Sequence, residues 1–265
     1  MTRRATKQLT KCVMDAREVF DMSGKVVAVT GGSRGMGEQM VRAFAANGAD
    51  VVIASRKLDN CVAVARDIEA ATGRRAMPYQ LHAARWDEAE PFVDAVYKEF
   101  GKCDVLVNNA GMSILYDKLS DVTEEMFDKV IGLNFKGPFR LASLFGERMK
   151  AAGSGAIINV SSTGSLRAAL NAIPYSGAKA ALNMMTEGMA QVLGPEVRVN
   201  TLMPGMTRTD ISKAWDPTDS ETLAKSYALQ RIGEPHEIIG AALLLASDAG
   251  SYISSSYLRV DGGIP

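Results

Sequence analysis

The sequence predicts a single α/β domain in which helices cover both faces of a doubly wound, parallel sheet of seven strands. Short runs of β-branched residues alternate with longer helical patterns from Lys25 onward, as expected for consecutive βαβ units. Several runs are almost continuously apolar, which is typical of strands that are buried on both faces. A length of 265 residues still allows one α/β domain to close around a common core.

Each strand is expected where an apolar run is bounded by helical patterns. The expected strands are Val26–Thr30, Val51–Ser55, Met77–His82, Val105–Asn108, Ala156–Ser161, Val197–Leu202 and Tyr257–Val260. The helical patterns begin near Gly35, Lys57, Asp87, Asp121, Pro174, Ser220 and Pro235. Asp121 with Glu124 three residues later predicts a capped helix start. The connection after Pro204 is long for a compact α/β unit, so we expect a substrate lid at about residues 205–230.

Composition excludes several classes of protein. Hydrophobic residues make up 47% of the chain and charged residues 23%, as in globular rather than disordered or fibrous proteins. Thirty basic residues balance thirty acidic ones, so we expect no nucleic-acid partner. Cys12, Cys61 and Cys103 are widely spaced without a CxxC motif, which predicts neither a disulfide framework nor a metal site.

The expected location is the cytoplasm. The three unpaired cysteines suit a reducing compartment. No apolar run approaches the roughly 18 residues that cross a bilayer, and the first residues lack the apolar core of a secretion signal. Residues 1–22 form a separate extension before the domain at 23–265, with four basic residues ahead of Asp15. A solvated extension is the favoured interpretation, with a transit peptide or an arm on a neighbouring subunit as alternatives.

A glycine-rich turn follows the first expected strand and opens a helix. It reads Thr30-Gly31-Gly32-Ser33-Arg34-Gly35-Met36-Gly37. Glycines here let the backbone approach a pyrophosphate, and the free N–H groups of the helix start receive its charge. A glycine-rich turn alone is weak evidence, but its place after the first strand of an alternating pattern predicts dinucleotide binding.

A proton-transfer pair is predicted at the start of a later helix. Tyr175 and Lys179 are four residues apart, which places both side chains on one helix face. An ammonium beside a phenol is expected to lower the phenol pKa from its usual value of about 10. Ser162 follows an apolar strand, at the sheet edge where ligands gather. Ser161 is the local alternative, although strand alternation points it to the other side.

Together these motifs resemble the classical short-chain dehydrogenase/reductase (SDR) family from about Ser23 to Asp261-Gly262-Gly263. The motifs fall in the family's order: Thr30–Gly37, Asn108-Asn109-Ala110-Gly111, Asn134, Ser162, Tyr175-xxx-Lys179, and Pro204-Gly205 with Thr209. The resemblance implies a Rossmann-type fold, a homotetramer and an NAD(P)-dependent oxidoreductase. The implied catalytic residues are Asn134, Ser162, Tyr175 and Lys179. The implied cofactor-binding residues are Thr30, Gly31, Ser33, Arg34, Gly35, Met36, Gly37, Ser55, Arg56, Asn108, Ala110, Gly111, Tyr175, Lys179, Pro204, Gly205, Thr207 and Thr209.

The resemblance also assigns individual roles. Ser162 would hydrogen-bond the reacting oxygen, and Asn134 would hold a water that links Lys179 to solvent. Tyr175 would take the hydroxyl proton while hydride leaves the same carbon for nicotinamide, and reduction would reverse both steps. Lys179 would also hold the nicotinamide ribose, and Thr209 the nicotinamide end.

NADP(H) is expected to be preferred over NAD(H), which stays possible. An NAD-selective site usually places a carboxylate at the end of the second strand, whereas this strand ends in Ser55 and Arg56. Arg34 in the glycine-rich turn faces the same corner, and guanidinium groups suit phosphate geometry. Where the family usually has an acidic residue near the adenine, this chain has His82. Either His82 makes that contact, or packing and backbone hold the adenine.

The expected substrate is a small molecule with an apolar body. The residues expected to line its cleft are Ile114, Leu166, Ile173, Met206 and Trp215. A non-catalytic dinucleotide-binding sensor or scaffold is the alternative function, but such a protein would not need a complete proton-transfer group. A lyase or epimerase on a related fold is disfavoured, because such relatives tend to carry an added substrate domain.

Overall fold

The computed structural model describes residues 15–209 and 217–265, and its centre is a parallel sheet of seven strands. The strand order is β3-β2-β1-β4-β5-β6-β7, and every neighbouring pair is parallel. The strands are β1 (Val26–Thr30), β2 (Asp50–Ser55), β3 (Ala76–Gln80), β4 (Val105–Asn108), β5 (Gly155–Val160), β6 (Val197–Pro204) and β7 (Tyr257–Val260). The predicted doubly wound sheet is confirmed.

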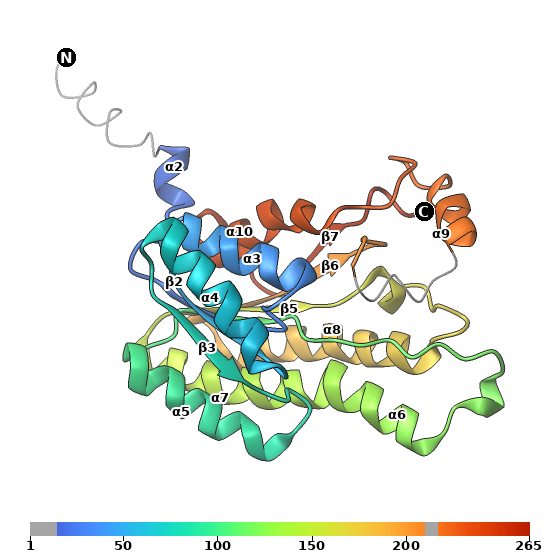
Figure 1. Cartoon of the computed structure of the whole chain (residues 1–265), viewed down its shortest axis with the longest axis horizontal. Helices are drawn as coiled ribbons and strands as arrows, with labels where there is room; N and C mark the ends of the chain where they lie inside the picture. Colours follow the sequence, from blue (N-terminus) through green and yellow to red (C-terminus); the bar gives the residue numbers. More distant parts are fainter. Residues whose placement is uncertain (1–14, 210–216) are drawn as a thin grey trace, which may run out of the picture.

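Helices cover the two faces of the sheet in separate layers (Figure 1). One layer contains α3 (Gly35–Ala46), α4 (Leu58–Thr72) and α10 (Ile239–Ala246). The other contains α5 (Trp86–Phe100), α7 (Gly137–Ala152) and α8 (Ile173–Leu193). Side chains of β1 alternate between the layers, since Val27 and Val29 join the first core whereas Val26 and Ala28 join the second. The apolar run of β1 is therefore buried on both faces.

The N-terminal segment joins the domain just before β1. The short helix α2 (Ala16–Val19) starts at Asp15, whose carboxylate accepts a hydrogen bond from the Arg17 amide. Met22 is fully buried in the core, so it packs with the domain rather than with the extension predicted for residues 1–22. Residues 1–14 of that extension lie outside the described residues. None of the described helices is both long and apolar enough to span a membrane.

The predicted cap at Asp121 is wrong. Asp121 ends a 3₁₀ turn (Leu119–Asp121) and its amide donates to Lys118, so it is already part of another turn. Helix α6 (Glu124–Ile131) instead begins after Thr123, whose hydroxyl accepts from the Met126 amide at 3.2 Å. Thr123 is the residue adjacent to the helix, and from there its hydroxyl reaches the third helical amide.

The long helix expected after Asp121 is interrupted by a π-turn (Gly132–Lys136) that lies between α6 and α7. The Gly137 amide donates to the Gly132 carbonyl, five residues back. Pro138 follows and has no N–H to donate to the carbonyl of Asn134, four residues before it. The wider turn thus accommodates a proline that would leave an α-helical hydrogen bond unmade, and Asn134 lies inside this turn.

Short elements connect β6, α10 and β7 in the C-terminal part of the chain, including a 3₁₀ turn (Asp248–Gly250) before β7. Helix α9 (Pro217–Ala224) follows β6, and a 3₁₀ turn (Pro235–Ile238) leads into α10. The chain order of the sheet reverses between β1 and β4, and ligands of open α/β sheets bind at the carboxyl ends of strands beside such a reversal.

Candidate active site

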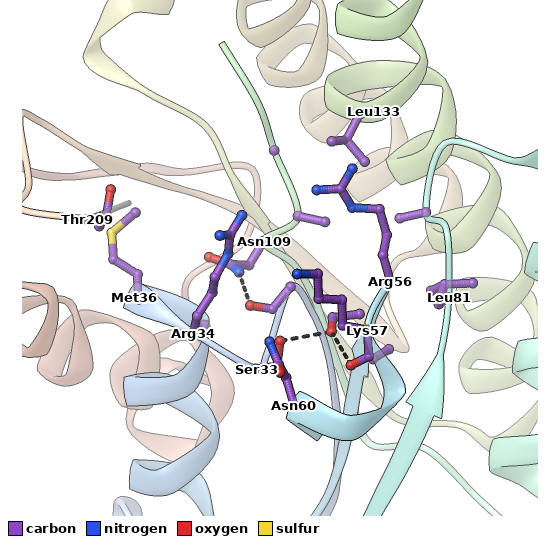
Figure 2. Close-up of a pocket in the computed structure, with 18 residues that line it drawn as sticks. Ser33, Arg34, Met36, Arg56, Lys57, Asn60, Leu81, Asn109, Leu133 and Thr209 are labelled. Atoms are coloured by element: carbon purple, nitrogen blue, oxygen red, sulfur yellow. Dashed lines mark hydrogen bonds between the residues drawn. The ribbon is translucent and has the colours of Figure 1, made fainter. Parts of the chain in front are cut away.

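A cleft of about 520 Å³ opens at the carboxyl ends of β1, β2 and β4 (Figure 2). Its walls come from the glycine-rich turn, the ends of these strands and the first turn of α4. The lining residues are Gly31, Ser33, Arg34, Gly35, Met36, Gly37, Ala54, Ser55, Arg56, Lys57, Asn60, Leu81, Ala83, Asn109, Ala110, Gly111, Leu133 and Thr209. The sequence analysis predicted eleven of these residues as cofactor-binding residues.

The glycine-rich turn has the backbone that the sequence predicts. Gly31 and Gly35 have φ angles of +66° and +55°, in the left-handed region that favours glycine. A Cβ on Gly37 would lie 2.2 Å from the Gly31 carbonyl oxygen, so no larger residue fits there. The turn leads into the N-terminus of α3, and the first amides and the dipole of a helix attract anions. The cleft therefore fits a dinucleotide with its pyrophosphate at this turn.

Thr30 and Asn109 join the ends of β1 and β4. The buried Thr30 hydroxyl accepts from the amides of Asn109 and Ala110, both at 3.0 Å. The Asn109 side chain donates to the Thr30 carbonyl at 2.9 Å and to the Gly31 carbonyl at 3.3 Å, and Figure 2 shows the second of these bonds. Thr30 thus supports the wall from behind, while Asn109 lines the cleft although it was not among the predicted residues. The sequence could have indicated Asn109, because it lies beside Asn108 in the motif Asn108-Asn109-Ala110-Gly111.

The corner at the end of β2 is polar and basic. The Ser33 hydroxyl donates to Ser55 at 2.8 Å, and the buried Cys61 sulfur lies 3.0 Å from the Ser55 oxygen. Arg34, Arg56 and Lys57 extend around this part of the hollow (Figure 2). None of the described lining residues is acidic. The sequence identified Ser55 and the two arginines but missed Lys57 and Asn60, which the first turn of α4 brings to the cleft.

The segment after β3 contributes apolar side chains to the cleft, and not the imidazole of His82. Leu81 and Ala83 line the cleft, whereas His82 lines a second hollow with Arg85 and Glu88, which shares only Arg56 with the cleft. The His82 amide donates to the Glu88 carboxylate at 2.7 Å, which fixes this segment. Of the two alternatives for the adenine, the geometry favours packing.

Three of the four predicted catalytic residues surround one point beside Gly111. Lys179 in α8 is 3% exposed, and its ammonium nitrogen donates to the Val160 carbonyl at 2.7 Å. Asn134 is fully buried, accepts from the Met112 amide at 3.3 Å and donates to the Met112 carbonyl at 2.8 Å. A Cβ on Gly111 would lie 3.0 Å from Asn134 Oδ1 and 3.5 Å from Lys179 Nζ. Tyr175 is the third, since Lys179 Nζ lies 5.8 Å from the centre of its ring.

Ser162 completes this group and Ser161 points elsewhere. The Ser162 hydroxyl interacts with Tyr175 and accepts from the Gly164 amide at 3.1 Å. Ser161 is buried, and its hydroxyl donates to the Lys179 carbonyl at 3.3 Å. Strand alternation thus separates the two hydroxyls in the expected way.

The electrostatics differ from the sequence-based expectation for Tyr175. Burial raises the pKa of the Tyr175 hydroxyl above its usual value, and the hydrogen bond with Ser162 lowers it by less. Burial also lowers the pKa of Lys179 to about 7. The expectation considered only the attraction between an ammonium and a phenolate, whereas desolvation penalises both charged forms.

Several predicted cofactor residues lie behind or beside the cleft. Asn108 is buried and donates to Asn159 Oδ1 at 2.9 Å, so it holds β4 and β5 together. Pro204, Gly205 and Thr207 do not line the cleft, but they lead to Thr209, which does. Met206 packs beside Tyr227 and Ile232. Trp215, expected at the substrate cleft, lies outside the described residues.

Comparisons with a family model and with known proteins all point to the same family. Residues 25–220 match the family model described as short chain dehydrogenase. The chain is 34% identical to an NAD-dependent glycerol dehydrogenase from Listeria innocua, over 92% of this chain and 95% of the relative. It is 37% identical to an L-rhamnose 1-dehydrogenase (NAD(P)(+)) from Azotobacter vinelandii, over 91% and 96%.

A solved structure agrees with this match. A gluconate 5-dehydrogenase from Burkholderia cenocepacia, in complex with NADP and tartrate, superposes with a TM-score of 0.89 at 30% identity. The match covers 94% of this chain and 98% of that chain. The chain therefore belongs to the short-chain dehydrogenase/reductase family, as an NAD(P)-dependent oxidoreductase that acts on alcohol and ketone substrates.

Proposed function

We propose that Tyr175 is the proton-transfer residue of this oxidoreductase and that Ser162, Lys179 and Asn134 support it. The observation that carries the proposal is the place of Ser162 and Tyr175 on either side of Gly164, close to the buried Lys179. A Cβ on Gly164 would lie 3.4 Å from Ser162 Oγ and 3.9 Å from Tyr175 Cε1. The nicotinamide supplies or accepts the hydride. In alcohol oxidation, Tyr175 takes the hydroxyl proton of the substrate, and Ser162 hydrogen-bonds the same oxygen. In ketone reduction, Tyr175 returns a proton to that oxygen.

Lys179 and Asn134 organise the proton's route. Lys179 is held by the Val160 carbonyl, so its nitrogen is fixed beside the Tyr175 ring. A lysine pKa of about 7 allows it to gain and lose a proton near neutral pH. Asn134 holds the Met112 backbone from inside the π-turn and leaves its Oδ1 facing the same point as Lys179 Nζ. These positions suit a water between the amide and the ammonium.

The cleft is proposed to prefer NADP(H) over NAD(H). Ser33, Ser55, Arg34 and Arg56 surround the corner where the adenosine ribose would lie, with Lys57 as a further cation. No carboxylate of the described lining residues would repel a 2′-phosphate or hold both ribose hydroxyls. Relatives use NAD in one case and both cofactors in another, so the preference rests on this corner.

The substrate is proposed to have an apolar body. Leu166 follows the turn that carries Ser162, and Ile173 lies two residues before Tyr175; their side chains are 59% and 42% exposed. Exposed apolar side chains this close to the reacting groups suit a hydrophobic substrate. The segment from 205 to 230 is proposed as a lid, because Thr209 reaches the cleft at one end of it. The named relatives act on polyols and sugars, which makes such compounds the competing class.

The proposal extends to assembly and location. Residues 23–265 would form one catalytic domain within a homotetramer, after a short extension at 1–22. Cys61 and Cys103 are buried and unpaired, which suits a reducing cytoplasm.

A cofactor and substrate panel tests this proposal. Rates with NADP and NAD would be measured for glycerol, L-rhamnose, gluconate, cyclohexanol and a hydroxysteroid. We expect higher kcat/KM with NADP and with the apolar alcohols. Combining Ser55→Asp with Arg56→Ser should shift the cofactor ratio about tenfold or more toward NAD, with about 1.4 kcal/mol of phosphate binding lost for each tenfold. Arg66→Ser, at an exposed position of α4 outside the cleft, is the control. More efficient use of NAD by the parent enzyme would refute the preference, and faster polyol turnover would refute the substrate class.

A further inference from the structure

Helix α8 carries a third polar residue on the face that bears Tyr175 and Lys179. Asn183 lies four residues after Lys179, so the three side chains follow one another along the helix. Its side chain is only 6% exposed, although neither the cleft nor the proton-transfer group includes it. A buried amide at this position needs an explanation.

The Asn183 amide reaches the turn that carries Ser162. Its Nδ2 donates to the Ser165 hydroxyl at 2.8 Å, and that hydroxyl donates to the Ser162 carbonyl at 2.6 Å. Because the single Ser165 proton goes to Ser162, Ser165 accepts from Asn183, which fixes the orientation of the amide. The Ser165 amide also donates to the Ser162 carbonyl at 2.9 Å. Helix α8 is thus connected to the 3₁₀ turn that follows Ser162 (Thr163–Ser165) by a chain of hydrogen bonds with one direction.

The side-chain oxygen of Asn183 is in an energetically unfavourable environment. Asn183 Oδ1 is buried and has no hydrogen-bond partner within residues 15–209 and 217–265. A buried acceptor without a partner costs free energy, so an apolar side chain would serve packing better. A purely structural role therefore explains Asn183 poorly.

We propose that Asn183 is a positioning residue that holds the Ser162 hydroxyl against Tyr175 by fixing Ser165. This inference rests on the roles proposed above for Ser162 and Tyr175. The Ser162 carbonyl is held by two groups of Ser165, and the Ser162 hydroxyl caps Gly164 within the same turn. When Asn183 is lost, Ser165 can rotate and the turn loosens. The Ser162 hydroxyl then leaves its place beside Tyr175 in a larger fraction of molecules.

The test compares Asn183→Ala, Asn183→Leu, Ser165→Ala and the double variant Asn183→Ala/Ser165→Ala. The assay uses the fastest alcohol of the panel with its better cofactor. We expect kcat to fall about tenfold in each single variant, while the KM for the cofactor changes less than twofold. The double variant should lose no more than the larger single effect, because both residues act through one chain of contacts. Tm should stay at the parent value or rise in the Asn183 variants.

The pH profile gives a readout that packing alone would not move. The hydrogen bond from Ser162 lowers the pKa of Tyr175, so loosening Ser162 should shift the limb of kcat/KM assigned to Tyr175 to higher pH. Asn200→Leu is the matched control, because Asn200 is also buried but bonds Ile253 and Ser256. This control should lower Tm and leave kcat of the folded enzyme unchanged.

The outcomes separate this inference from the proposed function. The inference alone would be overturned if Ser162→Ala is inactive while both Asn183 variants keep the kcat of the parent. In that case the limb of their pH profiles assigned to Tyr175 would also stay in place. Additive losses in the double variant, or a loss of kcat that follows Tm, would also overturn it, since either indicates a packing role. Ser162→Ala with parent-like activity would overturn the proposed catalytic roles and this inference with them.

Discussion

Tyr175 is the side chain on which turnover should depend most. Replacing it with Phe removes the transferable proton but keeps the ring beside Lys179. General acid–base groups contribute about 10²- to 10⁴-fold, so we expect kcat to fall by at least about 100-fold. Binding of the reduced cofactor, followed by its fluorescence, should change little. Tyr252→Phe, at a fully exposed tyrosine, is the control, and activity of Tyr175→Phe within tenfold of the parent would contradict the assignment.

Lys179 should make the stability of the cofactor-free enzyme rise with pH. Burial lowers its pKa from 10.5 to about 7, so between these values the unfolded chain binds one proton more than the folded chain. The free energy of unfolding therefore increases with pH in this window, by at most about 1.4 kcal/mol per unit. Below pH 7 both states hold the proton and the penalty is constant.

Urea unfolding of the parent and Lys179→Met from pH 6 to 9 measures this effect. The difference between their unfolding free energies should be flat below pH 7 and then change in favour of the parent. Tyr97 and Tyr257, whose pKa values are raised to about 12, affect stability only as pH passes 10, outside this range. Parallel curves for the two proteins would show that Lys179 keeps an ordinary pKa.

For individual residues, the sequence predicted which side chains of the catalytic group lie together, but not the direction of their pKa shifts. The four-residue spacing of Tyr175 and Lys179 is a property of any helix, so their shared face was foreseeable. Their pKa shifts depend on burial, which is produced by many distant segments together. Lys57 and Asn60 escaped prediction for a similar reason, because their access to the cleft depends on the direction in which α4 leaves β2.

Among the elements, the π-turn before α7 depends on one glycine. A Cβ on Gly137 would lie 1.9 Å from the Ala83 carbonyl oxygen, which belongs to the backbone that lines the cleft. We expect Gly137→Ala to lower the free energy of unfolding by about 3 kcal/mol and to weaken cofactor binding. Thermal unfolding and a cofactor titration measure both effects.

Gly188→Ala in α8 is the matched control for that substitution. Among the described residues, no atom beyond its chain neighbours and its own helix backbone lies within 4 Å of the Cβ it would add. Alanine is also the better helix former by about 0.5–1 kcal/mol. It should therefore be neutral or stabilising. A Gly137→Ala protein as stable as Gly188→Ala would show that the Ala83 segment can move away at little cost.

Helices and strands were predictable where a repeated pattern of apolar residues runs through the whole element. The seven strands follow from apolar runs: β1, β4 and β7 have the predicted bounds, and one or both ends of the other four move by one or two residues. The π-turn and the 3₁₀ turn before α6 were missed, since each depends on hydrogen bonds within a few residues rather than on a repeated pattern. Pro138 was the local signal for the first, and Thr123 was the local signal for the start of α6 after the second.

For the whole molecule, we expect four chains in solution. Large apolar side chains remain exposed on neighbouring helices of one face, with Phe127 on α6 47% exposed and Met184 on α8 66% exposed. Burying such side chains between copies is favourable. Sedimentation at micromolar concentration should show a tetramer, and Phe127→Glu with Met184→Glu should reduce its size. Leu58→Glu, on α4 in the other layer, is the control, and a monomeric parent would contradict the assembly.

The position of the site was predictable at this scale, whereas its detailed lining was not. Parallel strands bring their carboxyl ends to one edge, so residues at the ends of β1, β2 and β4 had to meet there. His82 also lies just beyond a strand, yet it faces another hollow. Which way such a residue turns is decided by local contacts, here the bond between its amide and Glu88.

The hydrogen bonds between Thr30 and Asn109 also bear on how the molecule is assembled. They join residues that are 79 positions apart, so the intervening chain must lose considerable freedom before they can form. The segment between them includes β2, which pairs with β1 on its other side, and β3, which pairs with β2. During synthesis the glycine-rich turn emerges early, but the opposite wall of the cleft is absent until β4 has left the ribosome. Nucleotide can therefore stabilise this cleft only after β4 has paired with β1.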